Sequence, residues 1–182
     1  EIKEIFNICN REKITIFDTA LLYKNSINKI KKNIKKKNKF EIIYKVLIKD
    51  KSYKKNFYKN VLFGINKLKG QRISILVHDS DEFLFVDKIK KKRIINFLEN
   101  LKIKKKIYRY GFSVYNLKEA INIMTNYNFD ILQVPINIFN HEFINQKFIK
   151  LIKSKKIEIH VRSIFLQGLF FLNKITIKKK LK

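Results

Sequence analysis

Four side chains of this sequence could bind or transfer protons, and each falls at or just past the end of a predicted strand. They are Asp18, Tyr23, Lys45 and His78. A free phenol, with a pKa of about 10, is a poor proton donor near neutrality, and a neighbouring cation lowers that pKa. Lys45 could be the cation beside Tyr23, and Asp18 could pair with Lys45 and fix its position. A neutral imidazole at His78 could donate one hydrogen bond to an oxygen. The set is therefore suited to acid catalysis.

The elements that would position these side chains alternate along the chain. The predicted strands cover residues 14–17, 40–46, 73–77, 106–114, 131–134 and 157–166. The predicted helices cover residues 1–11, 25–37, 54–68, 86–101, 117–127 and 142–154. Because no hairpin signal joins consecutive strands, we predict a parallel sheet with right-handed connections.

Apolar strand bodies with polar residues at their C-terminal ends are typical of a (β/α) barrel, in which those ends build the active site. We predict an α/β fold of the (β/α)8 TIM-barrel type that is incomplete, with about six βα units present. Residues 1–182 are expected to form a single barrel-like domain. The chain starts at Glu1 rather than at Met, so we expect a fragment of a longer barrel. A doubly wound open sheet is the alternative, but it favours a Gly-rich turn after the first strand, which this sequence lacks.

The charge of the chain is strongly positive, at +27, which ordinarily suggests a nucleic-acid or membrane partner. The chain is also rich in Lys, Asn, Ile, Phe and Tyr and has only 4 Gly and 1 Pro. The abundant residue types have A/T-rich codons and the scarce types have G/C-rich codons, so an A/T-rich genome accounts for the pattern. The basic runs 29–39 and 88–93 lack interleaved aromatic side chains. We therefore expect neither a specific nucleic-acid partner nor a membrane partner.

Metal and disulfide chemistry is not indicated by the sequence. Cys9 is the only cysteine, which excludes an internal disulfide and a cysteine-based metal cluster. The 3 His residues are scattered without metal-ligand spacing, so no metal site is predicted. No apolar run is long enough to span a bilayer and no signal peptide is evident, so a cytoplasmic protein is expected.

Four segments occur in an order that resembles the aldo/keto reductase family. They are 17–23 (Phe-Asp-Thr-Ala-Leu-Leu-Tyr), 44–46 (Tyr-Lys-Val), 76–78 (Leu-Val-His) and 111–116 (Gly-Phe-Ser-Val-Tyr-Asn). The resemblance extends from the first helix to Leu169. It implies reduction of an aldehyde, ketone or sugar carbonyl by hydride transfer. Tyr23 would then donate the proton, Lys45 and Asp18 would tune it, and His78 would orient the carbonyl oxygen.

The same resemblance implies a nicotinamide cofactor, usually NADP(H), with NAD(H) as the alternative. Asp18 would contribute to the cofactor site, and Ser113 and Gln133 would contact the carboxamide. Gln133 lies in an otherwise apolar strand and needs a partner, because burying an unpaired amide is costly. Arg162 stands where the family often has a ring-stacking aromatic residue, and Ser163 begins a segment expected along the pyrophosphate.

Some positions depart from the family pattern. Val114 replaces a frequent Asn, and Lys24 replaces the Gly that usually follows the tyrosine. Asn116 is predicted to cap the next helix rather than to bind a ligand. Arg162 could instead pair with Glu158 or another acid inside the barrel. The adenosine-phosphate site of the family is not recognisable in this sequence.

Two alternatives to an active reductase remain at this stage. The first is a non-catalytic reductase-like scaffold that binds RNA or anionic surfaces through its basic surface. The second is a degenerate chain that never closes its barrel and exposes its strand edges. The sequence does not predict the oligomeric state or the particular carbonyl substrate.

Overall fold

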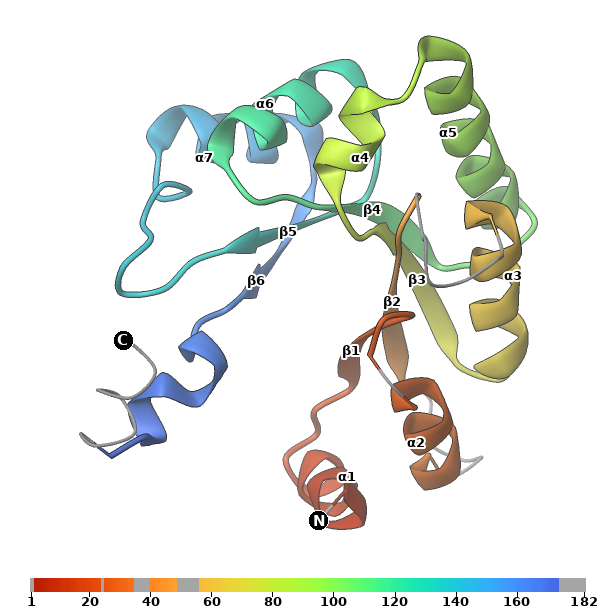
Figure 1. The fold of residues 1–182 in the computed structure, drawn as a ribbon, viewed down its shortest axis with the longest axis vertical. Coiled ribbons are helices and arrows are strands. Elements are labelled where there is room, and N and C mark those ends of the chain that lie inside the picture. Colours follow the sequence, from red (N-terminus) through yellow and green to blue (C-terminus); the bar gives the residue numbers. More distant parts are fainter. Residues whose placement is uncertain (1, 24, 35–39, 49–55, 174–182) are drawn as a thin grey trace.

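The computed structural model shows a parallel sheet of six strands curled into part of a barrel, with the helices that follow the strands on its outer side (Figure 1). It describes residues 2–23, 25–34, 40–48 and 56–173. The strands are β1 (Ile16–Ala20), β2 (Glu41–Val46), β3 (Arg72–Val77), β4 (Arg109–Ser113), β5 (Ile131–Pro135) and β6 (Glu158–Arg162). The helices are α1 (Ile2–Arg11), α2 (Ser26–Asn33), α3 (Phe57–Lys67), α4 (Ser80–Phe85), α5 (Lys88–Ile103), α6 (Leu117–Asn126) and α7 (Gln146–Lys155), and a 3-10 segment, η1 (Leu166–Phe171), follows β6.

The order of the strands in the sheet is the order of the strands in the chain. Each neighbouring pair from β1–β2 to β5–β6 is parallel. In a doubly wound sheet the spatial order of the strands reverses at a switch point between the two halves. No such reversal occurs among the described strands, so that alternative is wrong. The incomplete (β/α) barrel predicted from the sequence is confirmed, and its C-terminal strand ends lie along one rim.

Side chains on the strands alternate between two faces, as the pleat of a strand requires. Tyr44 and Val46 of β2 join the main apolar core beneath the helices. Ile43, between them, packs with Leu76 and Ile131 in a separate apolar cluster. Because both faces of the strands are buried midway along their length, the strands carry near-continuous apolar runs.

Two helices lie between β3 and β4, where the sequence predicted one helix at 86–101, and each begins at an aspartate cap. Asp79 caps α4 and accepts a hydrogen bond from the backbone of Asp81, and Asp87 caps α5 through the backbone nitrogen of Lys90 at 2.8 Å. An aspartate in the extended conformation at these points satisfies the free N–H groups of a new helix start. The prediction missed α4 because it spans only Ser80–Phe85.

Other boundaries differ from the prediction for equally local reasons. Helix α7 begins at Gln146 rather than Glu142, because Asn145 accepts hydrogen bonds from the first-turn backbone. Strand β6 ends at Arg162 rather than Leu166, because Ser163 adopts a left-handed backbone with φ of 63°. Parts of the predicted helices, at 35–37 and 54–55, and the basic residues 174–182 lie outside the described residues.

Among the described residues, none of the helices combines the length and the apolar character that a bilayer-spanning segment needs. In the same residues, no three His, Cys, Asp or Glu side chains are grouped as a metal site would need.

Candidate active site

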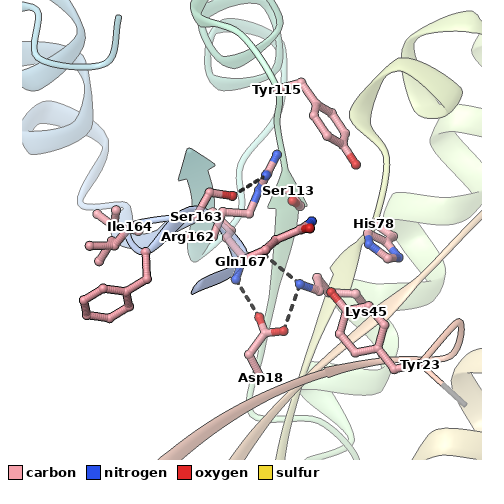
Figure 2. Close-up of a pocket in the computed structure, with 13 residues that line it drawn as sticks. Asp18, Tyr23, Lys45, His78, Ser113, Tyr115, Arg162, Ser163, Ile164 and Gln167 are labelled. Atoms are coloured by element: carbon pink, nitrogen blue, oxygen red, sulfur yellow. Dashed lines mark hydrogen bonds and ion pairs between the residues drawn. The ribbon is translucent and has the colours of Figure 1, made fainter. Parts of the chain in front are cut away.

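A cavity of about 560 Å³ opens at the C-terminal ends of the strands and gathers all eight predicted site residues (Figure 2). The predicted residues that line it are Asp18, Tyr23, Lys45, His78, Ser113, Gln133, Arg162 and Ser163. The remaining lining residues are Tyr115, Val161, Ile164, Phe165 and Gln167. Residues contributed by six strands and their following loops thus meet at one place, as expected at the C-terminal rim of a parallel barrel.

Three polar side chains form a closed ring at the base of this cavity. The ammonium of Lys45 lies 2.8 Å from Oδ1 of Asp18 and donates to Oε1 of Gln133 at 3.1 Å. Gln133 Nε2 donates in turn to Oδ2 of Asp18 at 2.6 Å. The Lys45 side chain is 5% exposed and that of Asp18 is 36% exposed. A buried ammonium is tolerated when it is paired and hydrogen-bonded, so the ring fixes both the charge and the position of Lys45.

The placement of Asp18 corrects the expectation that it stands at the end of its strand. Strand β1 continues to Ala20, which pairs with Lys45 in the parallel register, and the backbone nitrogen of Leu21 then donates to the Lys45 carbonyl at 3.1 Å. Asp18 therefore lies within β1. Residues two apart on a strand share a face, so Asp18 points to the same face as Ala20. Lys45 is the partner of Ala20 on β2, and it therefore lies diagonally opposite Asp18 on that face.

Tyr23 and His78 lie beside the hydrogen-bonded ring of Lys45, Asp18 and Gln133, and they belong to two different segments. Tyr23 lies in the turn after β1, where its backbone nitrogen donates to the Ala20 carbonyl at 3.1 Å. The Lys45 ammonium is 5.5 Å from the centroid of the Tyr23 ring. The Tyr23 and His78 rings meet edge to face, with centroids 6.2 Å apart. Tyr23 is 47% exposed and lines the cavity.

His78 is held in its neutral form by its surroundings. Burial lowers its pKa below 6.5, and the positive charge of Lys45 lowers it further, as Arg162 does to a smaller extent. The carboxylates of Asp18 and Asp79 act in the opposite direction. Nδ1 of His78 is buried and has no hydrogen-bond partner among the described residues. A neutral imidazole retains one N–H donor near pH 7.

Arg162, the last residue of β6, is stacked and hydrogen-bonded at the opposite side of the cavity. Its Cζ lies 4.6 Å from the centroid of the Tyr115 ring. Nη2 donates to the carbonyl of Val114 at 3.0 Å, and Nη1 donates to the hydroxyl of Ser163 at 3.3 Å. Its Nε is buried and finds no partner in the described part of the chain.

The alternative in which Arg162 pairs with Glu158 is wrong, because Glu158 has other partners. The Glu158 carboxylate pairs with Arg109 and lies 2.7 Å from Nε2 of His160. Arg109 also pairs with Glu41, at 2.7 Å. These side chains stand at the N-terminal ends of β2, β4 and β6, away from the candidate site. No local pattern in the sequence predicted this charged network.

Tyr115 was not predicted as a site residue, and its position depends on the start of α6. Asn116 caps α6 as predicted, because its side chain accepts from the backbone of Glu119 at 3.0 Å. The buried Glu119 carboxylate in turn accepts from the Tyr115 backbone nitrogen at 3.0 Å and from Ser80 at 2.5 Å. An aromatic residue two positions after Ser113 at a strand end was the available sequence signal.

Comparison with known proteins identifies the family of this chain. The family model of the aldo/keto reductase family matches residues 7–181. The chain belongs to the aldo/keto reductase family. By sequence, no curated protein matches it.

Solved aldo-keto reductases share the fold at low sequence identity. The holo form of such an enzyme from Bacillus halodurans has a TM-score of 0.73 and 19% identity, with 92% of this chain and 58% of that chain covered. A Pseudomonas aeruginosa protein provisionally described as an aldo-keto reductase has a TM-score of 0.71 and 19% identity, with coverage of 87% and 64%. A glycerol dehydrogenase from Gluconobacter oxydans has a TM-score of 0.66 and 17% identity, with coverage of 95% and 56%. The chain therefore spans a little under two thirds of the length of these relatives.

Aldo/keto reductases use a nicotinamide cofactor, and the donor set of the cavity fits its carboxamide. Ser113 and Gln133 are partners in the parallel register of β4 and β5, and both line the cavity. An amide side chain offers two N–H donors and two acceptor lone pairs. The ring with Asp18 and Lys45 uses one N–H and one lone pair of Gln133. The Ser113 hydroxyl and the free N–H and lone pair of the Gln133 amide can together form hydrogen bonds with both the N–H donors and the carbonyl acceptor of a carboxamide.

Proposed function

We propose that this chain carries the catalytic residues of an NAD(P)H-dependent reductase of small aldehydes, ketones or sugar carbonyls. The observation that carries the proposal is the ring of Lys45, Asp18 and Gln133, which fixes a buried ammonium 5.5 Å from the Tyr23 ring. A cation held there favours release of a phenolic proton. His78 completes the constellation, with its ring centroid 6.2 Å from that of Tyr23.

The proposed roles follow from the chemistry of each side chain. When bound, the reduced cofactor supplies a hydride to the carbonyl carbon. Tyr23 gives its proton to the carbonyl oxygen, so that the product is an alcohol, and the phenolate left behind is stabilised by Lys45. Asp18 keeps Lys45 charged and in position. The neutral imidazole of His78 donates a hydrogen bond to the same oxygen and orients it.

Four side chains, those of Asp18, Ser113, Gln133 and Arg162, would hold the nicotinamide end of the cofactor. Ser113 and Gln133 take the carboxamide, and Asp18 fixes the Gln133 amide in the required orientation. One face of the Arg162 guanidinium is covered by Tyr115, which leaves the other face for a ring. Ser163 begins the segment along the pyrophosphate. The family resemblance favours NADP(H), and NAD(H) is the second cofactor to test.

The test is the variant Tyr23→Phe in the full-length protein. General acid catalysis contributes about 10²- to 10⁴-fold, so carbonyl-dependent oxidation of NADPH should fall by at least about 100-fold. The affinity for NADPH, measured by quenching of its fluorescence, should stay unchanged. Tyr108→Phe is the matched control, because Tyr108 is similarly exposed but lies outside the cavity. Normal turnover by Tyr23→Phe would overturn the assignment.

A further inference from the structure

Arg162 brings a positive charge into the cavity without a carboxylate beside it. Its hydrogen-bond acceptors are the Val114 carbonyl and the Ser163 hydroxyl, and its stacking partner is Tyr115. All three partners are neutral. Within the described ranges, none of the ion pairs includes Arg162.

The other cations on the inner face of the sheet are paired. Lys45 pairs with Asp18 at 2.8 Å, and Arg109 pairs with both Glu41 and Glu158. A partly buried cation without a counter-charge is costly. The contrast therefore marks Arg162 as the position at which an anion from outside the described chain would be stabilised.

The charge balance of the cavity leads to the same position. The charged side chains among its described lining residues are Asp18, Lys45 and Arg162. Asp18 and Lys45 offset each other at 2.8 Å, and burial keeps His78 neutral because its pKa is lowered. The net charge of the lining is therefore positive, and it is centred on the guanidinium. In a site partly withdrawn from water, such a charge attracts an anion more strongly than it would at the surface.

The guanidinium is also held in a fixed orientation. Tyr115 covers one of its faces, and the Tyr115 backbone is itself tied to the buried carboxylate of Glu119. A guanidinium has five N–H donors in a planar fork. The contacts to Val114 and Ser163 use two of them. Nε is buried, which leaves one N–H on each of Nη1 and Nη2, and such a pair suits the oxygens of a carboxylate or phosphate, which arginine binds with defined geometry.

The guanidinium and the proposed acid stand on different sides of one cavity. Figure 2 shows Arg162 and Tyr115 approaching from β6 and β4, and Tyr23 and His78 approaching from the loops after β1 and β3. A small molecule with its carbonyl oxygen at Tyr23 and His78 can direct a second group toward Arg162. Because the charge of that residue is uncompensated, the group best accommodated there is anionic.

We propose that Arg162 selects carbonyl substrates that carry a carboxylate or phosphate group. This inference rests on the proposed function and names its substrate class. The anion could also be a phosphate of the cofactor, so the experiment separates these two sources.

The kinetic test compares substrates that differ in the anionic group. The pairs are 4-oxobutanoate with butanal, and glyceraldehyde 3-phosphate with glyceraldehyde. The wild-type protein should have the higher kcat/KM for the charged member of at least one pair. In Arg162→Gln, the ratio of charged to neutral kcat/KM should fall roughly 10- to 100-fold, the range expected for a charge-assisted hydrogen bond. Arg162→Lys should retain part of the preference.

The matched control is Arg72→Gln. Arg72 also stacks on a tyrosine, with its Cζ 4.7 Å from the Tyr108 ring, but it does not line the cavity. This variant should keep the wild-type ratio. A general structural effect of Arg162→Gln would lower kcat/KM for both members of a pair equally, so an unchanged ratio would overturn the inference.

A binding measurement keeps the inference testable if turnover is low. Calorimetric titration of the NADP⁺-loaded protein with butyrate, which has the carboxylate but no carbonyl, should give binding that Arg162→Gln weakens at least about 10-fold. If Arg162→Gln instead weakens NADPH itself and leaves the substrate ratio unchanged, the anion belongs to the cofactor and the inference is wrong. An active Tyr23→Phe protein overturns the proposed function, which is a different outcome.

Discussion

The side chain of Gln133 on β5 donates a hydrogen bond of 2.6 Å to Asp18 on β1, across 115 residues of sequence. In the sheet these two strands are separated by β2, β3 and β4. Neighbouring strands are about 4.8 Å apart, so a flat sheet would hold β1 and β5 about 19 Å apart. The contact therefore exists only because the sheet curls, and the curl also brings Lys45 to both side chains.

The first prediction concerns the carboxylate of this ring. Asp18→Asn leaves the Lys45 ammonium, which is 5% exposed, without its counter-charge. Because Asp18 is itself 36% exposed, we expect a loss of about 1–3 kcal/mol in the free energy of unfolding. Lys45→Met should cost less, because it leaves a carboxylate that water can reach. Urea unfolding gives the free energy of unfolding of both variants. Equal losses would contradict the explanation that an unpaired buried ammonium costs more than an unpaired carboxylate that water can reach.

The second prediction concerns the pH dependence of stability. His78 has a pKa lowered below 6.5 by burial, Lys45 and Arg162, against the opposing charges of Asp18 and Asp79. The unfolded chain therefore takes up this proton at a higher pH than the folded protein does. It follows that the His78 contribution to stability is complete above pH 6.5 and is lost as the pH falls toward the lowered value.

The measurement for His78 is thermal unfolding between pH 5 and pH 8. His78→Gln should remove part of the fall in Tm below pH 6.5, whereas His141→Gln, at an exposed position, should leave the curve unchanged. A wild-type Tm profile reproduced by His78→Gln would show that the imidazole does not titrate in this way.

The third prediction concerns the network at the N-terminal ends of the strands. Arg109 pairs with Glu41, which is only 2% exposed and also accepts from Ser74 at 2.6 Å. Arg109→Met leaves a buried carboxylate unpaired and should cost about 3–5 kcal/mol. The double variant Glu41→Gln with Arg109→Met removes that charge and should recover part of the loss.

The control for Arg109→Met is Arg72→Met. Arg72 is exposed on the neighbouring strand and stacks on Tyr108, so its loss should change stability by about 1 kcal/mol at most. Chemical unfolding of the four proteins gives the comparison. A double variant no more stable than Arg109→Met alone would argue against an unpaired carboxylate as the cause.

The fourth prediction concerns the close approach of β4 and β5. A Cβ added at Gly111 would lie 1.8 Å from the backbone oxygen of Ile131. Gly111→Ala should therefore push the strands apart, lower stability by about 1–3 kcal/mol or more, and disturb the pairing of Ser113 with Gln133. Gly70→Ala is the comparison, because Gly70 has a positive φ of 98° but no atom within 4 Å of the added carbon. Denaturant midpoints that rank Gly70→Ala as the more harmful change would refute the steric argument.

The amino-acid sequence alone determined the class of fold and eight of the residues that line the cavity. Alternating apolar strands and amphipathic helices predicted the parallel barrel, and polar residues near the C-terminal strand ends predicted Asp18, Tyr23, Lys45 and His78. The resemblance to the aldo/keto reductase family added Ser113, Gln133, Arg162 and Ser163, and all eight line the cavity. These inferences succeed because strand periodicity and strand ends are local properties, and because parallel strands bring their C-terminal ends to one rim. The need of Gln133 for a buried partner was predicted for the same reason.

The tertiary structure alone decided which side chains pair with one another. The position of Asp18 inside β1 depends on its register with β2. The ion pairs of Arg109 on β4 with Glu41 on β2 and with Glu158 on β6, like the contact of Gln133 with Asp18, join residues far apart in sequence on strands that are not neighbours in the sheet. Their existence depends on the curvature of the sheet, which arises from the packing of all its strands and helices together. No local pattern therefore encodes that Arg162 stands without a carboxylate while Arg109 has two.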